Sequence, residues 1–261
     1  MNMKKLPKIK IDPKTKYVPI SQEIDFFNLF RKIEANTDNC FIFESLGEEG
    51  KFARYSVIGL DPEHIIGARG GNIIFDGKIF KVPNPYFALR QIMPPKNFGE
   101  NYAGGLVGYL GYETLNYFQF FPKVKTHECF DEFIFGVYTD GLILDKLTGE
   151  LTYFYHNTNR INLIKKFISL RVRNEKFGIE FIADGLSRQA HAQIVRKVKN
   201  AIRAGKTFQC EVGFKKKYRI RGNPIRVYRK LRMVNPSPFM YYLKFGDKKI
   251  IGASPELLFS L

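Results

Sequence analysis

Apolar residues recur at two spacings along the chain, and these spacings predict a mixture of helices and strands. Apolar positions three and four residues apart indicate helices, whereas short runs rich in β-branched and aromatic residues between turn-forming residues indicate strands. Helices are expected at 21–33, 85–93, 159–173, 187–204 and 223–231. Strands are expected at 40–46, 54–60, 64–68, 73–82, 207–220, 239–245 and 249–253, with three more between 132 and 156.

Local signals place the ends of several of these elements. Ser21 and Ser187 are candidate N-caps, and Gly205 ends the long helix that Ser187 begins. Asp76-Gly77 is a candidate hairpin turn between two apolar runs. Residues 174–185 are polar and irregular, so we expect them to connect two domains.

The order of these elements indicates the fold class. Clusters of strands with helices set between them, rather than a strict alternation of strand and helix, indicate an α+β fold. We expect antiparallel sheets flanked by helices. A chain of 261 residues can bury one large core or two smaller ones.

The formal charge of +17 is the one unusual property of the composition. It permits binding of nucleic acid, of an acidic protein or of a dianionic substrate, and net charge alone does not choose among them. The basic run at 215–221 continues to Arg232 and contains Tyr218 and Tyr228 between its cations, which suits a nucleic-acid backbone. Such a run is more often the solvated face of a strand and a helix, so nucleic-acid binding is kept as a remote alternative.

The sequence carries no signal for a membrane or for secretion. No apolar run approaches the roughly 18 residues that span a membrane. The N-terminus is basic without an apolar stretch, which is not the pattern of a signal peptide. Cys40, Cys129 and Cys210 are odd in number and widely spaced, so we expect free thiols in a reducing cytoplasm.

Three motifs that suggest a cofactor or a metal do not fit on closer inspection. The glycines of AGGLVGYLG at 103–111 match neither GxGxxG nor the P-loop, so close backbone packing within a sheet is expected there. Gly205-Lys206-Thr207 ends like a P-loop, but a helix rather than a strand precedes it. His127 and Cys129 lack further ligands at metal-site spacing.

The stretch NPSPFMYYLKFGDKKIIGASPELLFSL at 235–261 is the most specific segment of the chain. Its two prolines stiffen the entry because each fixes its own φ and restricts the residue before it. A strand, a turn at Gly246-Asp247 and a returning strand follow. Ser254-Pro255 then breaks the second strand and places Glu256 before an apolar run. A rigid turn, a hairpin and an aimed carboxylate are the parts of a binding or catalytic site.

This stretch resembles component I of the anthranilate synthases, within the chorismate-utilising enzyme family. In that family an NPSPYM-like turn, a hairpin and a GSSPE-like stretch follow one another in this order. Asn235 to Met240 and Ile251 to Leu258 match the pattern, except that Phe239 stands for Tyr and Ala253 for Ser. The resemblance extends over nearly all of the chain and over the first half of the family's large subunit, so the C-terminal half of the chorismate-binding domain is expected to be missing.

The resemblance also implies a division into domains. It predicts a basic tail at 1–14, a regulatory, tryptophan-binding domain at 15–157, a connecting helix and linker at 158–186, and the start of a chorismate-binding domain at 187–261.

Two residues match catalytic positions of the family. Gln209 stands where the water-using relatives carry a lysine that activates water, and a neutral amide cannot act as that base. Family members usually show a stretch close to GDIFQVVLS there, from which Lys206, Thr207 and 210–213 depart. Glu256 matches the general acid that protonates the leaving 4-hydroxyl of chorismate.

A second site is implied for tryptophan as a feedback inhibitor. In the family, tryptophan binds an LLES-type strand and the NPSPYM turn, and a basic residue helps to hold it. The matching residues are Glu44, Ser45, Arg54, Asn235, Pro236, Ser237, Pro238, Phe239 and Met240. A hydroxyl, a carboxylate and a Met suit a zwitterion with a flat apolar ring. Without the resemblance, Ser45 is a strand-end residue that caps its own backbone.

The implied activity is that of a lyase of tryptophan biosynthesis, which makes anthranilate and pyruvate from chorismate and ammonia. The implied partner is a glutamine amidotransferase subunit, and the implied cofactor is Mg²⁺, with its ligands expected beyond Leu261. The chain alone is expected to be inactive. Component I of aminodeoxychorismate synthase is the close alternative, because the residues that separate the two enzymes lie mostly beyond Leu261.

Overall fold

The computed structural model describes residues 5–46, 54–94, 102–118, 123–172 and 176–259. The chain forms two compact units, Met1–Val172 with Val227–Leu261, and Arg173–Arg226. The predicted α+β fold with antiparallel sheets flanked by helices is confirmed.

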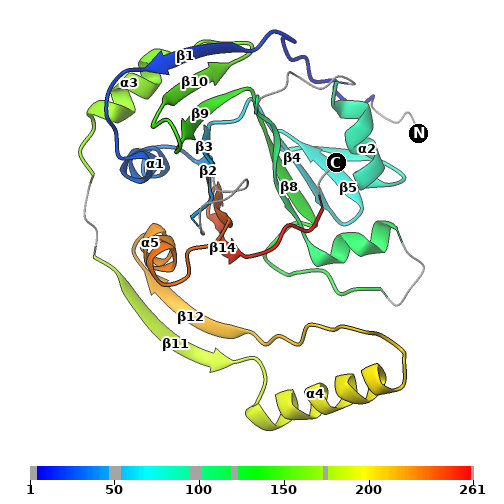
Figure 1. The fold of residues 1–261 in the computed structure, drawn as a ribbon. Helices are drawn as coiled ribbons and strands as arrows, with labels where there is room; N and C mark the ends of the chain where they lie inside the picture. The colour runs from blue at the N-terminus through cyan, green and yellow to red at the C-terminus, as the bar shows by residue number, and fades with distance from the viewer. Residues whose placement is uncertain (1–4, 47–53, 95–101, 119–122, 173–175, 260–261) are drawn as a thin grey trace. The chain divides into compact units, whose positions relative to one another are not determined.

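The larger unit contains a seven-stranded antiparallel sheet (Figure 1). In spatial order its strands are β1 (Lys16–Ile20), β10 (Leu151–Tyr155), β9 (Asp140–Asp145), β3 (Tyr55–Leu60), β2 (Asn39–Glu44), β13 (Phe239–Phe245) and β14 (Lys248–Ser254). The hairpin predicted within the C-terminal stretch is therefore β13–β14. Its first strand pairs with β2, which lies about two hundred residues earlier in the sequence.

A second antiparallel sheet of five strands belongs to the same unit. Its order is β6 (Lys78–Lys81), β5 (Asn72–Phe75), β4 (His64–Arg69), β8 (Phe133–Tyr138) and β7 (Gly105–Leu110). A 3₁₀ helix, η1 (Tyr112–Tyr117), follows β7. Asp76 and Gly77 have positive φ values of 46° and 77°, as a two-residue hairpin turn requires, so the turn predicted there is confirmed.

Four helices accompany these sheets: α1 (Phe26–Glu34), α2 (Pro85–Ile92), α3 (Ile161–Ser169) and α5 (Ile225–Val234). The first helix begins at Asp25, whose carboxylate accepts a hydrogen bond from the Asn28 amide at 2.9 Å. The predicted start at Ser21 was wrong by one turn, because the cap hydrogen bond forms at Asp25.

The central strands β3, β2 and β13 of the seven-stranded sheet are buried on both faces, and alternation along β2 assigns side chains to each face. Phe41 packs with Val107 and Ile134 of the other sheet, so this face forms the core between the two sheets. On the opposite face, Tyr242 contacts Phe30 of α1 with ring centroids 5.5 Å apart. The larger unit therefore has three layers: helices, the seven-stranded sheet and the five-stranded sheet.

The smaller unit contains β11 (Gly178–Asp184), β12 (Lys216–Arg221) and α4 (Arg188–Arg203). The predicted cap of α4 is confirmed, since the Ser187 hydroxyl accepts from the Ala190 amide at 3.1 Å. Two predictions for this region were wrong. Most of the supposed connection at 174–185 is strand β11, and only the end of the strand expected at 207–220 forms, because β12 pairs with β11 from residue 216 onward.

These units divide the chain differently from the predicted domains. The units place 227–261 with the N-terminal residues, whereas the resemblance assigned 187–261 to one domain. The functional domain boundaries stay a prediction.

The glycines at 104–111 serve close packing, as expected. A Cβ on Gly108 would overlap the carbonyl oxygen of Ile134 on the paired strand β8. His127 accepts hydrogen bonds from the amides of Cys129 and Phe130, so it stabilises a local turn. Within the described part of the chain, no helix is long and apolar enough to cross a membrane.

We expect Gly108→Ala to lower the thermal midpoint, because the added methyl would push β7 away from β8. Overpacking of this kind costs about 1–3 kcal/mol. Gly213→Ala is the control, since a Cβ there meets nothing within 4 Å. Calorimetric melting of both variants makes the test, and equal midpoints would contradict the packing argument.

Candidate ligand-binding site

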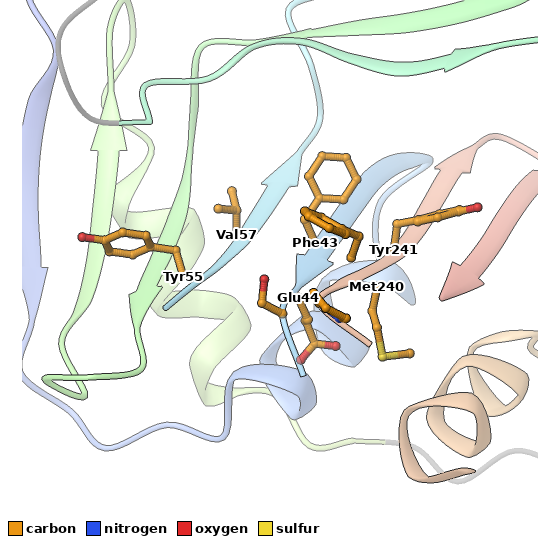
Figure 2. A pocket seen from close by; sticks show the side chains of 9 residues that line it. Phe43, Glu44, Tyr55, Val57, Met240 and Tyr241 are labelled. Carbon is orange, nitrogen blue, oxygen red and sulfur yellow. The ribbon is translucent and has the colours of Figure 1, made fainter. Parts of the chain in front are cut away.

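A pocket of about 280 Å³ lies at the ends of β2, β3 and β13 (Figure 2). Its lining comes from three stretches, 43–45, 55–57 and 238–241, the last of which is far from the others in sequence. The lining residues are Phe43, Glu44, Ser45, Tyr55, Val57, Pro238, Phe239, Met240 and Tyr241. The surface they form is mainly apolar, which suits a flat hydrophobic ligand with a few polar groups.

The pairing of β2 with β13 joins the two sequence motifs predicted to bind tryptophan. Met240 lies directly opposite Glu44 in the antiparallel register. Just beyond the strand, the Leu46 amide donates to the carbonyl oxygen of Ser237 at 2.9 Å. The FES stretch (Phe43-Glu44-Ser45) and the NPSPFM turn (residues 235–240) therefore form one continuous wall of the pocket.

The side chains of this wall point to two opposite faces. Phe43 and Val57 extend to one side of the strands, and Glu44 and Met240 extend to the other (Figure 2). Phe43 belongs to the apolar layer between the two sheets. Ser45 lies just beyond the end of β2, is buried, and also lines the pocket. Its hydroxyl is one of the polar side-chain groups of the lining, with the phenols of Tyr55 and Tyr241.

The Glu44 carboxylate is engaged on the opposite side by α5. It accepts hydrogen bonds from the Tyr228 hydroxyl at 2.9 Å and from Nε and Nη2 of Arg232, each at 2.8 Å. Glu44 is only 4% exposed, so these three donors satisfy a buried charge. Burial, together with the nearby Glu44 charge, raises the pKa of Tyr228 far above its usual value, which keeps the phenol protonated as a donor.

Sequence reasoning missed Tyr228 and Arg232 as partners of Glu44. Both had been placed in the basic run as surface residues. The available signal was the acid itself, because a Glu within the apolar run CFIFESL needs a buried cation or donor.

Arg54 lies beside the pocket rather than in its lining. Its guanidinium forms an ion pair with Asp145, with Nη2 and Oδ2 2.6 Å apart, and lies 4.9 Å from the centroid of the Tyr55 ring. Hydrogen bonds from Arg54 hold the pKa of Asp145 below its usual value. The role of Arg54 as a ligand-holding cation stays a prediction.

Within the NPSPFM turn, the first three residues support the wall and the last three line it. The Asn235 amide donates to Leu231 of α5 at 2.9 Å, and Ser237 is buried. Pro236 falls between them, outside the pocket lining.

Comparison with known proteins identifies the family. A sequence profile described as chorismate binding enzyme matches residues 18–261. The chain belongs to the chorismate-binding enzyme family.

The relatives of the chain agree with the resemblance noted in its sequence. It is 44% identical over 262 residues to anthranilate synthase component 1 of Leptospira biflexa, covering 98% of the chain and 57% of the relative. It is 35% identical to the protein of that name from Methanothermobacter marburgensis, covering 92% of the chain and 53% of the relative. The resemblance to component I is therefore confirmed, and the chain spans about half the length of these relatives.

A solved structure supports the fold. The crystal structure of anthranilate synthase component I from Streptococcus pneumoniae TIGR4 matches with a TM-score of 0.62 and 22% identity. The match covers 81% of this chain and 52% of that one.

The two predicted catalytic residues of this family member lie outside the pocket. Gln209 is exposed in the smaller unit, where its carbonyl oxygen accepts from the Thr207 hydroxyl at 2.8 Å. Glu256 is exposed in the larger unit after β14, with its carbonyl oxygen 2.8 Å from the Ser254 hydroxyl that donates to it. Their catalytic roles stay predictions.

The basic run at 215–232 is partly neutralised by ion pairs within the protein. Lys216 pairs with Asp184 at 3.1 Å and Arg219 with Glu180 at 3.2 Å, both in the smaller unit. Arg232 pairs with Glu44 in the larger one. These contacts give three of its cations a partner inside the protein.

Proposed function

We propose that this chain forms part of an anthranilate synthase component I, which makes anthranilate and pyruvate from chorismate and ammonia. The support is its 44% identity to such a protein over 98% of the chain. In this proposal a glutamine amidotransferase subunit supplies the ammonia. Aminodeoxychorismate synthase component I is kept as the alternative, and identification of the aromatic product by fluorescence and mass, with the complete polypeptide and ammonium, decides between them.

The proposed chemistry assigns one task to each catalytic candidate. Gln209 carries a neutral amide, so it does not activate water, and ammonia is left as the nucleophile at C2. Glu256 donates a proton to the leaving 4-hydroxyl, which requires burial or a neighbouring charge to raise its pKa. Glu256 is exposed in this structure, so the proposal requires a further segment to cover it.

Magnesium is not assigned to the described residues. In ranges 5–46, 54–94, 102–118, 123–172 and 176–259, no three His, Cys, Asp or Glu side chains gather where they could hold a metal ion. We propose that the Mg²⁺ ligands belong to the part of the relatives that this chain does not match, and we derive no step through the metal.

The pocket at the ends of β2, β3 and β13 is the proposed regulatory site for tryptophan. The observation that supports it is the joining of the FES stretch to the NPSPFM turn through β2 and β13. Aromatic and aliphatic side chains would contact the indole ring, and Ser45 with nearby main-chain groups would contact the polar end.

We expect Ser45→Phe and Met240→Thr to weaken tryptophan binding about tenfold or more. Ser45→Phe removes a hydroxyl, and a lost hydrogen bond to a charged ligand group is worth about 1.5–3 kcal/mol, whereas Met240→Thr removes apolar contact area. Ser45→Phe also fills the pocket. The same exchanges at exposed positions, Ser169→Phe and Met233→Thr, are the controls. Calorimetric titration measures all four, and unchanged affinity in both pocket variants would remove the regulatory assignment.

In the complete enzyme, Glu256→Gln should lower kcat by about 10²–10⁴-fold and chorismate binding much less, because an amide cannot donate the proton. Glu150→Gln, at an exposed turn, is the control. Steady-state kinetics from pH 6 to 8 gives the answer. Near-full turnover of Glu256→Gln across that range would return Glu256 to a structural role.

We expect the 261-residue polypeptide alone to form no anthranilate from chorismate, ammonium and Mg²⁺. Helix α4 buries no residue and Leu258 is 91% exposed, so apolar surface is left to be covered by another segment. Adding a polypeptide that corresponds to the unmatched half of the relatives should restore turnover. Turnover by a pure monomer of the 261-residue chain would disprove the need for a second polypeptide.

A further inference from the structure

The ion pair between Glu44 and Arg232 stands at the back of the proposed tryptophan pocket, and the inference drawn from it rests on that proposed function. Glu44 contributes to the pocket wall, yet its carboxylate lies on the side of β2 that faces α5 (Figure 2). The next residue, Ser45, and the paired residue, Met240, both line the pocket. The contacts of the Glu44 side chain with α5 therefore hold the segment that shapes the pocket.

The partners of Glu44 are themselves fixed. Tyr228 is fully buried, with its ring centroid 5.9 Å from that of Phe27 and 5.8 Å from that of Tyr242. The Arg232 guanidinium lies 4.2 Å from the centroid of the Phe27 ring. A bidentate guanidinium and a phenol, both held by packing, allow the carboxylate one orientation.

The geometry leaves little capacity for a second role of this carboxylate. Oε2 accepts from both Tyr228 and Arg232, and Oε1 accepts from Arg232. Contacts within the protein therefore already occupy both oxygens of the Glu44 carboxylate.

We propose that Tyr228 and Arg232 are positioning residues for the tryptophan pocket, which hold the Glu44 carboxylate on the helix side of β2 and thereby fix Ser45 and Met240 around the ligand. Glu44 is then an anchor for α5 rather than the counter-ion of the ligand ammonium. Binding of the ligand and docking of α5 are coupled through the end of β2, and such coupling acts equally in both directions.

The test compares two ligands in calorimetric titrations of the complete enzyme. Tryptophan carries the ammonium group, and indole-3-propionate lacks it. Arg232→Met, which can still pack on Phe27, should weaken both ligands by the same factor of roughly ten. The same exchange at Arg229, an exposed residue of α5, is the matched control and should leave both affinities unchanged.

A rescue variant separates positioning from direct contact. Glu44→Leu/Tyr228→Phe/Arg232→Met replaces the whole buried polar group by apolar residues, a change that proteins often tolerate. It should restore most of the affinity for both ligands. If Arg232→Met does not fold, Tyr228→Phe, which removes one hydroxyl only, replaces it in the titrations with the two ligands.

Hydrogen exchange supplies a readout that a purely structural role would not move. Tryptophan should slow exchange of the α5 amides in the wild-type enzyme and lose that effect in Arg232→Met, or in Tyr228→Phe in its place. Two results would overturn the proposal and assign the Glu44 carboxylate to the ligand ammonium group. In the first, Arg232→Met weakens binding of tryptophan but not of indole-3-propionate. In the second, the triple variant binds tryptophan as weakly as Arg232→Met does. A wild-type enzyme that binds no tryptophan would instead reject the regulatory site, and this inference with it.

Discussion

The antiparallel pairing of β13 with β2 is the contact on which the rest of the larger unit depends. It joins residues about two hundred positions apart, so a large loop must close before any of its hydrogen bonds form. Burial on both faces of the pair offsets that entropy. Phe41 and Leu243 pack between the two sheets, while Ile42 and Tyr242 pack on the helix side. The pocket exists because this pairing places 43–45 beside 238–241 at the ends of the two strands.

What could be predicted from sequence is mainly what is local. The Asp76-Gly77 turn and the Ser187 cap depend on residues within a few positions of each other, and both formed as expected. Strand β11 was missed because its hydrogen-bonding partner lies some forty residues later, at 216–221. Its apolar residues, Ile179 and Phe181, stay half exposed, so no burial pattern marked it as part of a core.

The candidate site divides in the same way. The motifs named its residues, and the pairing of strands brought most of them together, which no local pattern showed. The opposite faces of Phe43 and Glu44 were available from sequence, since both lie in β2 and side chains alternate along a strand. The partners of Glu44 could not be predicted from sequence, because Arg232 reaches its carboxylate only after α5 has packed on the sheet. A basic run therefore resembled a surface until the fold placed one of its members against a buried acid.

Two buried acids on the helix side make the register of β13 specific. Glu34 accepts from the Tyr242 hydroxyl at 2.9 Å, and Glu44, opposite Met240, accepts from Tyr228 and Arg232. A slip of one residue would turn Tyr242 toward the other sheet and leave Glu34 without that donor, at a cost that apolar contacts alone would not impose. The same slip would move Met240 and Phe239 out of the pocket wall. Polar contacts on one face of the sheet thus determine which side chains a ligand meets at its end.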